Sequence, residues 1–141
     1  MQRKEQIDGA VYERNYIYNF HYHLIWVTKY RNPAFTTPEL VNEMKDILLQ
    51  LAEMKEICIE EMEVMPDHVH LLISFKPKHA PADIVKYLKG HSAKMFLTAH
   101  PEIKNHDFWG GHLWSHSYYM STLGNMSKEV VEQYIRNQYT K

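Results

Sequence analysis

Residues 65–75 read MPDHVHLLISF, and this stretch indicates a tight turn followed by a β-strand. Met65-Pro66-Asp67 has the composition of a turn, and His68 begins a run in which two kinds of side chain alternate. Successive side chains of a strand point to opposite faces of the sheet. One face is uniformly apolar and consists of Val69, Leu71, Ile73 and Phe75. The other face carries His68 and His70 together. We therefore expect helices to cover the apolar face and the histidine face to be open.

The elements around this strand predict an α+β fold. Thr37 and Pro38 have the residue types of a helix N-cap and first turn. The other expected elements are a strand at 16–30, a strand at 57–64, a helix at 81–99, a loop at 101–111, a strand at 113–123 and a helix at 127–139. This order is the split βαβ arrangement of ferredoxin-like folds. It predicts an antiparallel sheet with helices on one face and an extra C-terminal helix.

The composition indicates one domain that spans residues 1–141, with a loose lead-in at residues 1–15. The net charge of −1 gives no global support for nucleic-acid binding, although acids and bases are segregated along the chain. The only cysteine, Cys58, excludes an internal disulfide and is expected in the core. We find neither a secretory signal nor an apolar run of membrane-spanning length, which fits a cytoplasmic protein without membrane contact.

His68 and His70 are the first candidate for chemistry. Two imidazoles at positions i and i+2 of a strand can share one divalent ion, and a third ligand must then come from elsewhere. Histidines on a strand are more often partly exposed surface residues, so this pattern is weak by itself. His21 and His23 have the same spacing and are a direct rival. His106, His112 and His116 are further candidates for metal binding.

Tyr134 is the second candidate, and it lies four residues before Gln138 in the expected last helix. Residues at i and i+4 share a helix face, so a phenol nucleophile and an amide oxygen ligand can reach one site. A tyrosine in such a helix usually packs its ring on the core, and Tyr139 is a nearby competitor. Together with the histidines, Tyr134 fits metal-assisted phosphoryl transfer through a covalent tyrosine ester.

Several motifs in this order resemble the single-tyrosine HUH transposases of the smallest bacterial and archaeal insertion sequences. The similarity covers residues from about Tyr16 to Gln138. The matching pieces are YHLIW (22–26) with KYR (29–31), MEVMPDHVHLL (62–72), KYLKG (86–90), WGGHLWS (109–115) and the final Tyr134 with Gln138. An isolated HUH motif is weakly specific, whereas five pieces in this order and in a chain of this length are highly specific.

The resemblance implies a set of roles for the residues of this chain. His68, His70 and Gln138 would bind a divalent metal, Mg²⁺ or Mn²⁺. Tyr134 would form a 5′-phosphotyrosine with single-stranded DNA and free a 3′-hydroxyl. The resemblance also implies a homodimer that recognises hairpins at the ends of the element. The candidate DNA-contacting residues are Lys29, Arg31, Lys86 and Lys89.

Two other hypotheses remain open on the sequence. The first is a domesticated hairpin-binding or nicking protein that no longer moves an element. The second is a non-catalytic nucleic-acid-binding module on the same fold, which would need exposed aromatic residues such as Phe20 or Tyr22 on the open face. A metal requirement for activity would exclude the second hypothesis.

Overall fold

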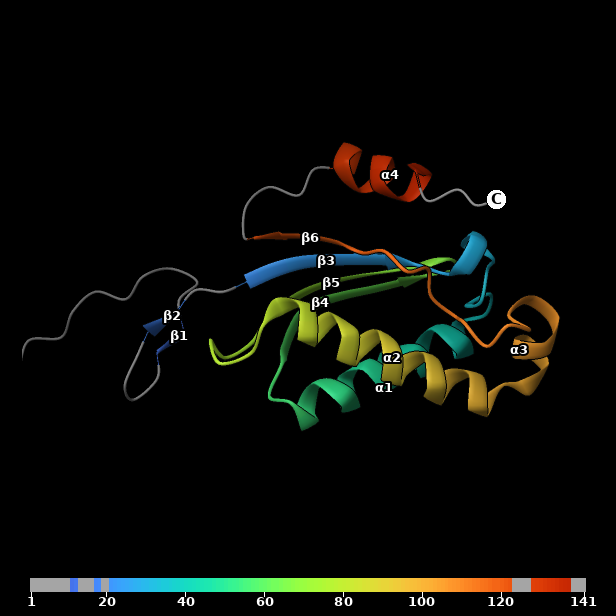
Figure 1. The fold of residues 1–141 in the computed structure, drawn as a ribbon, viewed down its shortest axis with the longest axis horizontal. Helices are drawn as coiled ribbons and strands as arrows, with labels where there is room; N and C mark the ends of the chain where they lie inside the picture. Colours follow the sequence, from blue (N-terminus) through green and yellow to red (C-terminus); the bar gives the residue numbers. More distant parts are fainter. Residues whose placement is uncertain (1–10, 13–16, 19–20, 123–127, 138–141) are drawn as a thin grey trace, which may run out of the picture.

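The computed structural model describes residues 11–12, 17–18, 21–122 and 128–137. Its main sheet has four antiparallel strands in the order β4-β5-β3-β6 (Figure 1). The bounds of these strands are His21–Val27 for β3, Cys58–Met65 for β4, His68–Ser74 for β5 and Tyr119–Thr122 for β6. Two short strands, β1 (Val11–Tyr12) and β2 (Ile17–Tyr18), pair separately. The central pair β3–β5 is flanked by β4 and β6, which confirms the predicted ferredoxin-like arrangement.

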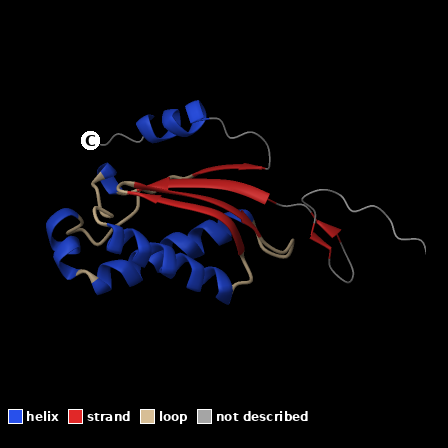
Figure 2. Ribbon diagram, turned by 180° about the vertical axis from the view of Figure 1, so that it is seen from behind, coloured by secondary structure: helices blue, strands red, loops and turns tan. Residues whose placement is uncertain are grey.

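Helices lie on both faces of the main sheet. Helices α1 (Pro38–Met54) and α2 (Pro81–Ala99) cover one face, and α4 (Lys128–Asn137) lies over the other (Figures 1 and 2). The Thr37 side chain accepts a hydrogen bond from the backbone N–H of Leu40 at 3.2 Å, which confirms the predicted helix start. Because Pro81 also occupies the first turn of its helix, both long helices begin where the sequence indicated.

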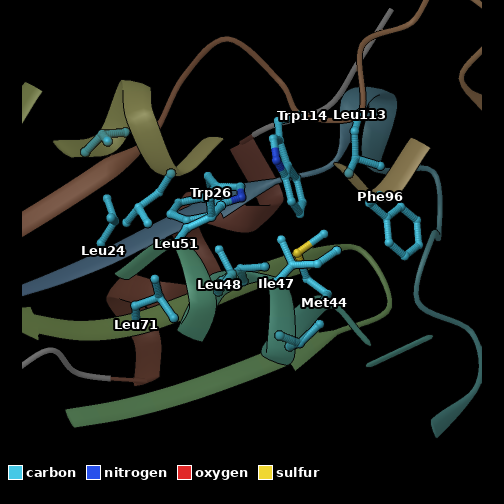
Figure 3. Packing of buried hydrophobic residues seen from close by; sticks show 14 of the residues in the cluster. Leu24, Trp26, Met44, Ile47, Leu48, Leu51, Leu71, Phe96, Leu113 and Trp114 are labelled. Atoms are coloured by element: carbon cyan, nitrogen blue, oxygen red, sulfur yellow. The ribbon is translucent and has the colours of Figure 1, made fainter. Parts of the chain in front are cut away.

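The core lies between the sheet and the first two helices, and its largest side chains are aromatic (Figure 3). Trp26 of β3 and Trp114 pack edge to face, with ring centroids 5.6 Å apart. Phe35 contacts Trp114 and Phe96. The buried Trp114 indole donates a hydrogen bond to Ser92 Oγ at 3.0 Å, so α2 is joined to the segment that precedes β6. The apolar face of β5 contributes Val69, Leu71 and Ile73 to this core, as predicted.

Three expected boundaries were wrong. Residues 101–107 form helix α3 (Pro101–Asp107), which has the proline and the acidic first turn of a helix but no apolar period. The fourth strand is much shorter than 113–123, because residues 113–118 run past the end of β3 with a single bridge between Thr28 and Trp114. The first strand does not extend to Tyr30, since a 3₁₀ turn, η1 (Lys29–Arg31), follows β3.

The histidine face is only partly open, which corrects the expectation of a fully open face. Helix α4 contacts β3 on this face, and the outward-facing Ile25 and Val27 are both 0% exposed, whereas His68 and His70 stay partly exposed. The sequence pattern predicts the last helix but does not show the surface on which it packs. The expectation that Cys58 belongs to the core was also wrong, since this residue is exposed at the start of β4. No helix in the described part of the chain is long and apolar enough to cross a membrane.

Candidate functional site

The two histidines of β5 share one face of the sheet, as the alternation predicted. Val69 between them is fully buried, while His68 and His70 are partly exposed on the opposite side. The core thus anchors the strand through the central residue and leaves two imidazoles on the outer face.

His68 is oriented by the residue that precedes it. Its Nδ1 lies 2.9 Å from Asp67 Oδ1, and the Arg31 Nε donates to Asp67 Oδ2 at 3.3 Å. The hydrogen bond with His68, assisted by Arg31, lowers the pKa of Asp67 although burial opposes the shift. A carboxylate on Nδ1 leaves Nε2 of His68 as the nitrogen that can bind a metal. The sequence placed Asp67 in a turn and did not indicate this role.

The loop that carries Arg31 is tied to the turn that carries Asp67. Thr28 donates to the Asp67 carbonyl from its backbone N–H at 2.9 Å, and Ala34 N–H donates to the Pro66 carbonyl at 2.8 Å. Tyr30 and Arg31 have positive φ angles of 57° and 54°. Two non-glycine residues in this region cost about 1–3 kcal/mol each, so the surrounding contacts must hold the backbone there. The strained loop places the guanidinium beside the histidine turn.

His70 has a second histidine as its neighbour. His23 Nδ1 lies 3.4 Å from His70 Nε2, because β3 and β5 are paired in antiparallel register. Burial, followed by the neighbouring His23, lowers the pKa of His70, which favours the neutral imidazole that a metal requires. The two histidines of the rival pair, His21 and His23, therefore have different surroundings. His21 is buried and lies against Glu60 at 3.1 Å, whereas His23 belongs to the site.

His68 and His70 offer two imidazole side chains on one face of the sheet, a donor type that divalent transition metals accept. Two ligands do not complete the coordination of such an ion. Among the described residues, no group of three His, Cys, Asp or Glu side chains is arranged to hold a metal. The predicted third ligand, Gln138, lies outside the described residues.

A cavity opens beside His70 on the outer face of the sheet. It has a volume of about 490 Å³ and is lined by His70, Leu72 and three residues of β4, Glu61, Met62 and Glu63. The register places Glu63 directly opposite His70. The two carboxylates make the space beside the imidazole electrostatically favourable for a cation. The sequence showed these glutamates only as part of an acidic run.

Tyr134 lies on α4 and packs against the strand at the other edge of the sheet. Its hydroxyl is 3.1 Å from Ser117 Oγ, and its ring centroid is 5.7 Å from that of Tyr119. Burial raises the pKa of the Tyr134 phenol, and the hydrogen bond with Ser117 only partly offsets this shift. The phenol is thus kept protonated in this arrangement. Ser117 was not identified from the sequence, which contains no local signal for this contact.

The register shows how the tyrosine and the histidines are placed relative to each other. Ile25 of β3 pairs with His70 on one side and with Tyr119 on the other. The three residues therefore form one row on the same face of the sheet. Neighbouring strands are about 4.8 Å apart, so β5 and β6 are separated by about 10 Å. Because Tyr134 packs on Tyr119, it shares a face with the histidines but lies over a different strand.

The four candidate DNA-contacting residues fall into two places. Lys29 and Arg31 lie in η1, where the Lys29 ammonium is 5.3 Å from the centroid of the Tyr30 ring. Lys86 is exposed on α2. Lys89 is half-buried and donates to the carbonyls of Ser115 and Ser117 at 2.7 and 2.9 Å. Burial lowers the pKa of Lys89 to about 8. Lys89 therefore anchors the segment that holds Tyr134.

The remaining histidine candidates lie apart from this face. His106 is exposed and contacts Asp107 at 2.9 Å. The rings of His112 and His116 are 6.1 Å apart in the segment before β6. These histidines were further candidates for metal binding, and no group of three His, Cys, Asp or Glu side chains in the described ranges includes them.

Comparisons with known proteins agree with the motifs. A family model described as "Transposase IS200 like" matches residues 16–138. The ISDra2 transposase TnpA of Deinococcus radiodurans is 42% identical over 128 residues, which are 91% of this chain and 90% of that protein. The transposase for insertion sequence element IS200 of Salmonella typhimurium is 32% identical over 125 residues, which are 86% of this chain and 78% of that protein.

Solved structures show the same architecture. A crystal structure of a Deinococcus radiodurans R1 protein assigned as a transposase superimposes with a TM-score of 0.83 at 40% identity. The alignment covers 93% of this chain and 99% of that one. A REP-associated tyrosine transposase bound to a REP hairpin superimposes with a TM-score of 0.54 at 13% identity, over 92% of this chain and 75% of that one. The second similarity concerns the fold alone.

Proposed function

Because the chain belongs to the IS200-like transposase family, we propose that it cuts and rejoins single-stranded DNA at insertion-sequence ends through a 5′-phosphotyrosine. The observation that carries this proposal is the row across the outer face of the sheet. His70 and Tyr119, on which Tyr134 packs, share one surface with His68, and the Asp67 carboxylate supports His68. Such a surface can hold a phosphodiester between an electrophilic site and a nucleophile.

In this proposal His68, His70 and Gln138 hold a divalent metal, Mg²⁺ or Mn²⁺. The ion supplies Lewis-acid polarisation of the scissile phosphate when it is bound. Asp67 holds His68 so that Nε2 faces outward, and the lowered pKa of His70 keeps its imidazole neutral. His23, 3.4 Å from His70, fixes the position of that ring. Imidazole ligands favour Mn²⁺ over Mg²⁺ on chemical grounds.

Tyr134 is the proposed nucleophile. The phenol gives up its proton and a bond forms between its oxygen and phosphorus. The bond from phosphorus to the 3′ oxygen breaks, and that oxygen takes up a proton and leaves as a 3′-hydroxyl. The covalent ester retains the energy of the phosphodiester, so rejoining requires no nucleotide cofactor. For attack the ring must leave Ser117 and reach the histidines of the same chain or of a second copy. The proposal includes a homodimer, as the family resemblance implies. The proposed substrate is DNA with hairpin ends, and the proposed location is the cytoplasm.

The test is a covalent-capture experiment. The protein is incubated with labelled single-stranded DNA from the flanks of its own gene, with Mn²⁺ or EDTA, and is then denatured in detergent. We expect a DNA band at protein mass that requires the metal and is lost in Tyr134→Phe. Tyr139→Phe is the matched control and should retain the band. A covalent band that persists in Tyr134→Phe would contradict the proposed nucleophile.

The same experiment distinguishes a transposase from a domesticated protein that no longer moves an element. Hairpin binding without any covalent product in wild-type protein would favour a binding protein that no longer transfers strands. Nicking without rejoining would favour a processing enzyme. The intact His68, His70, Tyr134 and Gln138 speak against a protein that has lost catalysis, whereas they do not distinguish a transposase from a nicking enzyme.

A further inference from the structure

Tyr30 is an exposed aromatic residue in a strained backbone conformation. It is 55% exposed, and its φ and ψ angles are 57° and 17°. Asparagine, aspartate and glycine visit this left-handed region most readily, whereas a bulky residue there is an outlier. The Tyr30 hydroxyl makes no hydrogen bond within the described ranges. The strain at this position therefore indicates a role for the ring outside the fold.

The backbone on either side of Tyr30 is fixed by contacts with one neighbouring segment. The N–H of Lys29 donates to the Leu113 carbonyl at 2.8 Å. The side chain of Asn32 donates to the Asp107 carbonyl at 3.1 Å. A ring that is carried by a fixed backbone loses little conformational freedom when a ligand binds to it, so the turn is preorganised for a contact.

The turn η1 lies at the end of the sheet that carries His68. In Figure 1 this light-blue turn follows the end of β3, in the layer of the strands rather than in that of α1 and α2. Val27, the last residue of β3, pairs with His68. Three steps of about 3.8 Å along the chain and one cross-strand step of about 5 Å place the Tyr30 Cα no more than about 17 Å from that of His68. Arg31 contacts Asp67, which orients His68, so the turn is joined to the proposed metal site.

The surroundings of the ring fit a single-stranded polynucleotide. Every nucleobase has a face that can stack on an aromatic side chain, and such stacking is commonly combined with cations that contact the backbone. The Lys29 ammonium lies 5.3 Å from the centroid of the Tyr30 ring. A base on the ring would therefore have a cation close to its own phosphate or the next one. Because bases in a duplex stack on each other, the ring suits unpaired DNA.

We propose that Tyr30 stacks on an unpaired nucleobase near the scissile phosphate and that Lys29 contacts the backbone beside this base. The inference rests on the proposed function and adds a binding position for one base to it. At about 3.4 Å per nucleotide, a distance of 17 Å corresponds to roughly five nucleotides from the phosphate at His68. Stacking tolerates any base, so this contact positions the strand and does not select its sequence.

The first test measures binding of a single-stranded oligonucleotide from the flank of the gene, by fluorescence anisotropy in EDTA. Tyr30→Asn removes the ring and introduces a residue that accepts the left-handed conformation. We expect the affinity to fall about 5- to 150-fold, the range for the loss of stacking on one base. Tyr30→Phe keeps the ring and should bind like wild type. Leu49→Asn removes a 47% exposed apolar side chain from α1 and is the matched control, with no expected change.

Two further measurements separate stacking from a structural role. The ring carries no charge, so Tyr30→Asn should leave the slope of log affinity against log salt unchanged, whereas Lys29→Gln should reduce it by about 0.7. Because asparagine relieves the strain, the thermal midpoint of Tyr30→Asn should equal or exceed that of wild type. A lower midpoint would show that the ring serves the fold, and an equal loss of affinity in Tyr30→Phe would show that the hydroxyl makes the contact. Either result would overturn the proposal.

The stacked base can be located with 2-aminopurine, a fluorescent purine whose emission is quenched by stacking. It replaces the nucleotides of the flank one position at a time. We expect added quenching on binding at one position in wild type, and its loss in Tyr30→Asn. Quenching that is the same in both proteins at every position would contradict a base on Tyr30.

The outcomes distinguish the base-binding position from the proposed reaction. A covalent product in wild type, with unchanged single-strand binding in Tyr30→Asn, would refute the stacking and leave the reaction standing. Weakened binding in Tyr30→Asn, without any covalent product in wild type, would do the reverse. A change in the size-exclusion mass of Tyr30→Asn would show that the ring contacts a second copy of the chain and would overturn the proposal.

Discussion

At the scale of single residues, Asp67 joins three parts of the site. Its two carboxylate oxygens contact His68 and Arg31, and its backbone carbonyl accepts from Thr28. A carboxylate that supports a ligating histidine fixes the tautomer and raises the basicity of the free nitrogen. Arg31 holds this carboxylate from the far side and is itself held in a left-handed conformation. If His68 binds the metal as proposed, its affinity for the ion depends on Asp67, a residue that is not a ligand.

The role of Asp67 predicts a change in metal affinity. In Asp67→Asn the side chain keeps its shape but loses the negative charge, so we expect Mn²⁺ affinity to fall about 10–100-fold. Titration calorimetry measures this directly, without any DNA present. Asp46→Asn, an exposed substitution on α1, is the control and should leave the affinity unchanged. An unchanged Mn²⁺ affinity in Asp67→Asn would show that the carboxylate serves only the fold.

At the scale of elements, the segment between Leu113 and Tyr118 connects the tyrosine to the body of the protein. Backbone bonds between Lys29 and Leu113 and between Ser115 and Val27 fix its start. Lys89 of α2 fixes its end through two carbonyls, and Ser117 then holds Tyr134. The segment makes few β-sheet hydrogen bonds, and hydrogen bonds from side chains satisfy part of its backbone instead.

Loss of the Lys89 contacts should destabilise the protein. Lys89→Met keeps the length of the side chain and leaves two carbonyls without their donor, so we expect a cost of about 1–3 kcal/mol in the free energy of unfolding. Urea unfolding followed by circular dichroism measures it. Lys86→Met on the same helix is the control, because Lys86 is exposed. Equal stability of the two variants would contradict the anchoring role.

The lowered pKa of Lys89 makes the stability difference between wild type and Lys89→Met depend on pH. Burial lowers the pKa from 10.5 to about 8, so between these values the unfolded chain binds more protons than the folded one. The contribution of Lys89 to stability should therefore increase as the pH rises from about 8 toward 10.5 and decrease as the pH falls through 8. The stability difference between wild type and Lys89→Met should be larger at the alkaline end of this range.

The elements also show how far the sequence alone determines the structure. Helices α1 and α2 were predicted because a proline marks the start of each, and in α1 the N-cap Thr37 and apolar residues at helical spacing add to this signal. The alternation in β5 placed His68 and His70 correctly. The contact between His23 and His70 could not be predicted, because the two residues are 47 positions apart in the sequence and meet only through the register of their strands. The contact of Tyr134 with Ser117 depends on the docking of a whole helix, which no local pattern encodes.

At the scale of the whole molecule, charge is distributed between the two sides of the sheet. Glu61 and Glu63 line the cavity beside His70, whereas a groove of about 730 Å³ between α2 and residues 111–118 is lined by four lysines and two histidines without acids among the described residues. The net charge of −1 therefore conceals two surfaces of opposite character. One favours a cation and the other a phosphate backbone.

This distribution predicts a moderate salt dependence of hairpin binding. With the three exposed lysines of this groove, Lys86, Lys94 and Lys104, as the main phosphate contacts, log affinity should fall against log salt with a slope of about −2.7, or about 40-fold for a fourfold rise in salt. Anisotropy titrations at several salt concentrations measure it. A slope near zero would show that binding is not governed by phosphate contacts, and a slope near −8 would require many cations outside the groove.

Because His70, Ile25 and Tyr119 form one row, the site depends on the number of residues that precede Tyr119 in its segment. A strand alternates between its two faces, so removal of Tyr118, which lies between Ser117 and Tyr119, would turn Tyr119 inward and Met120 outward. Insertion of one residue there would also reverse the faces, whereas insertion of two residues would restore them with a shift along β3. The length of this segment can therefore change only by an even number of residues if Tyr119, on which Tyr134 packs, is to stay on the face that carries His70.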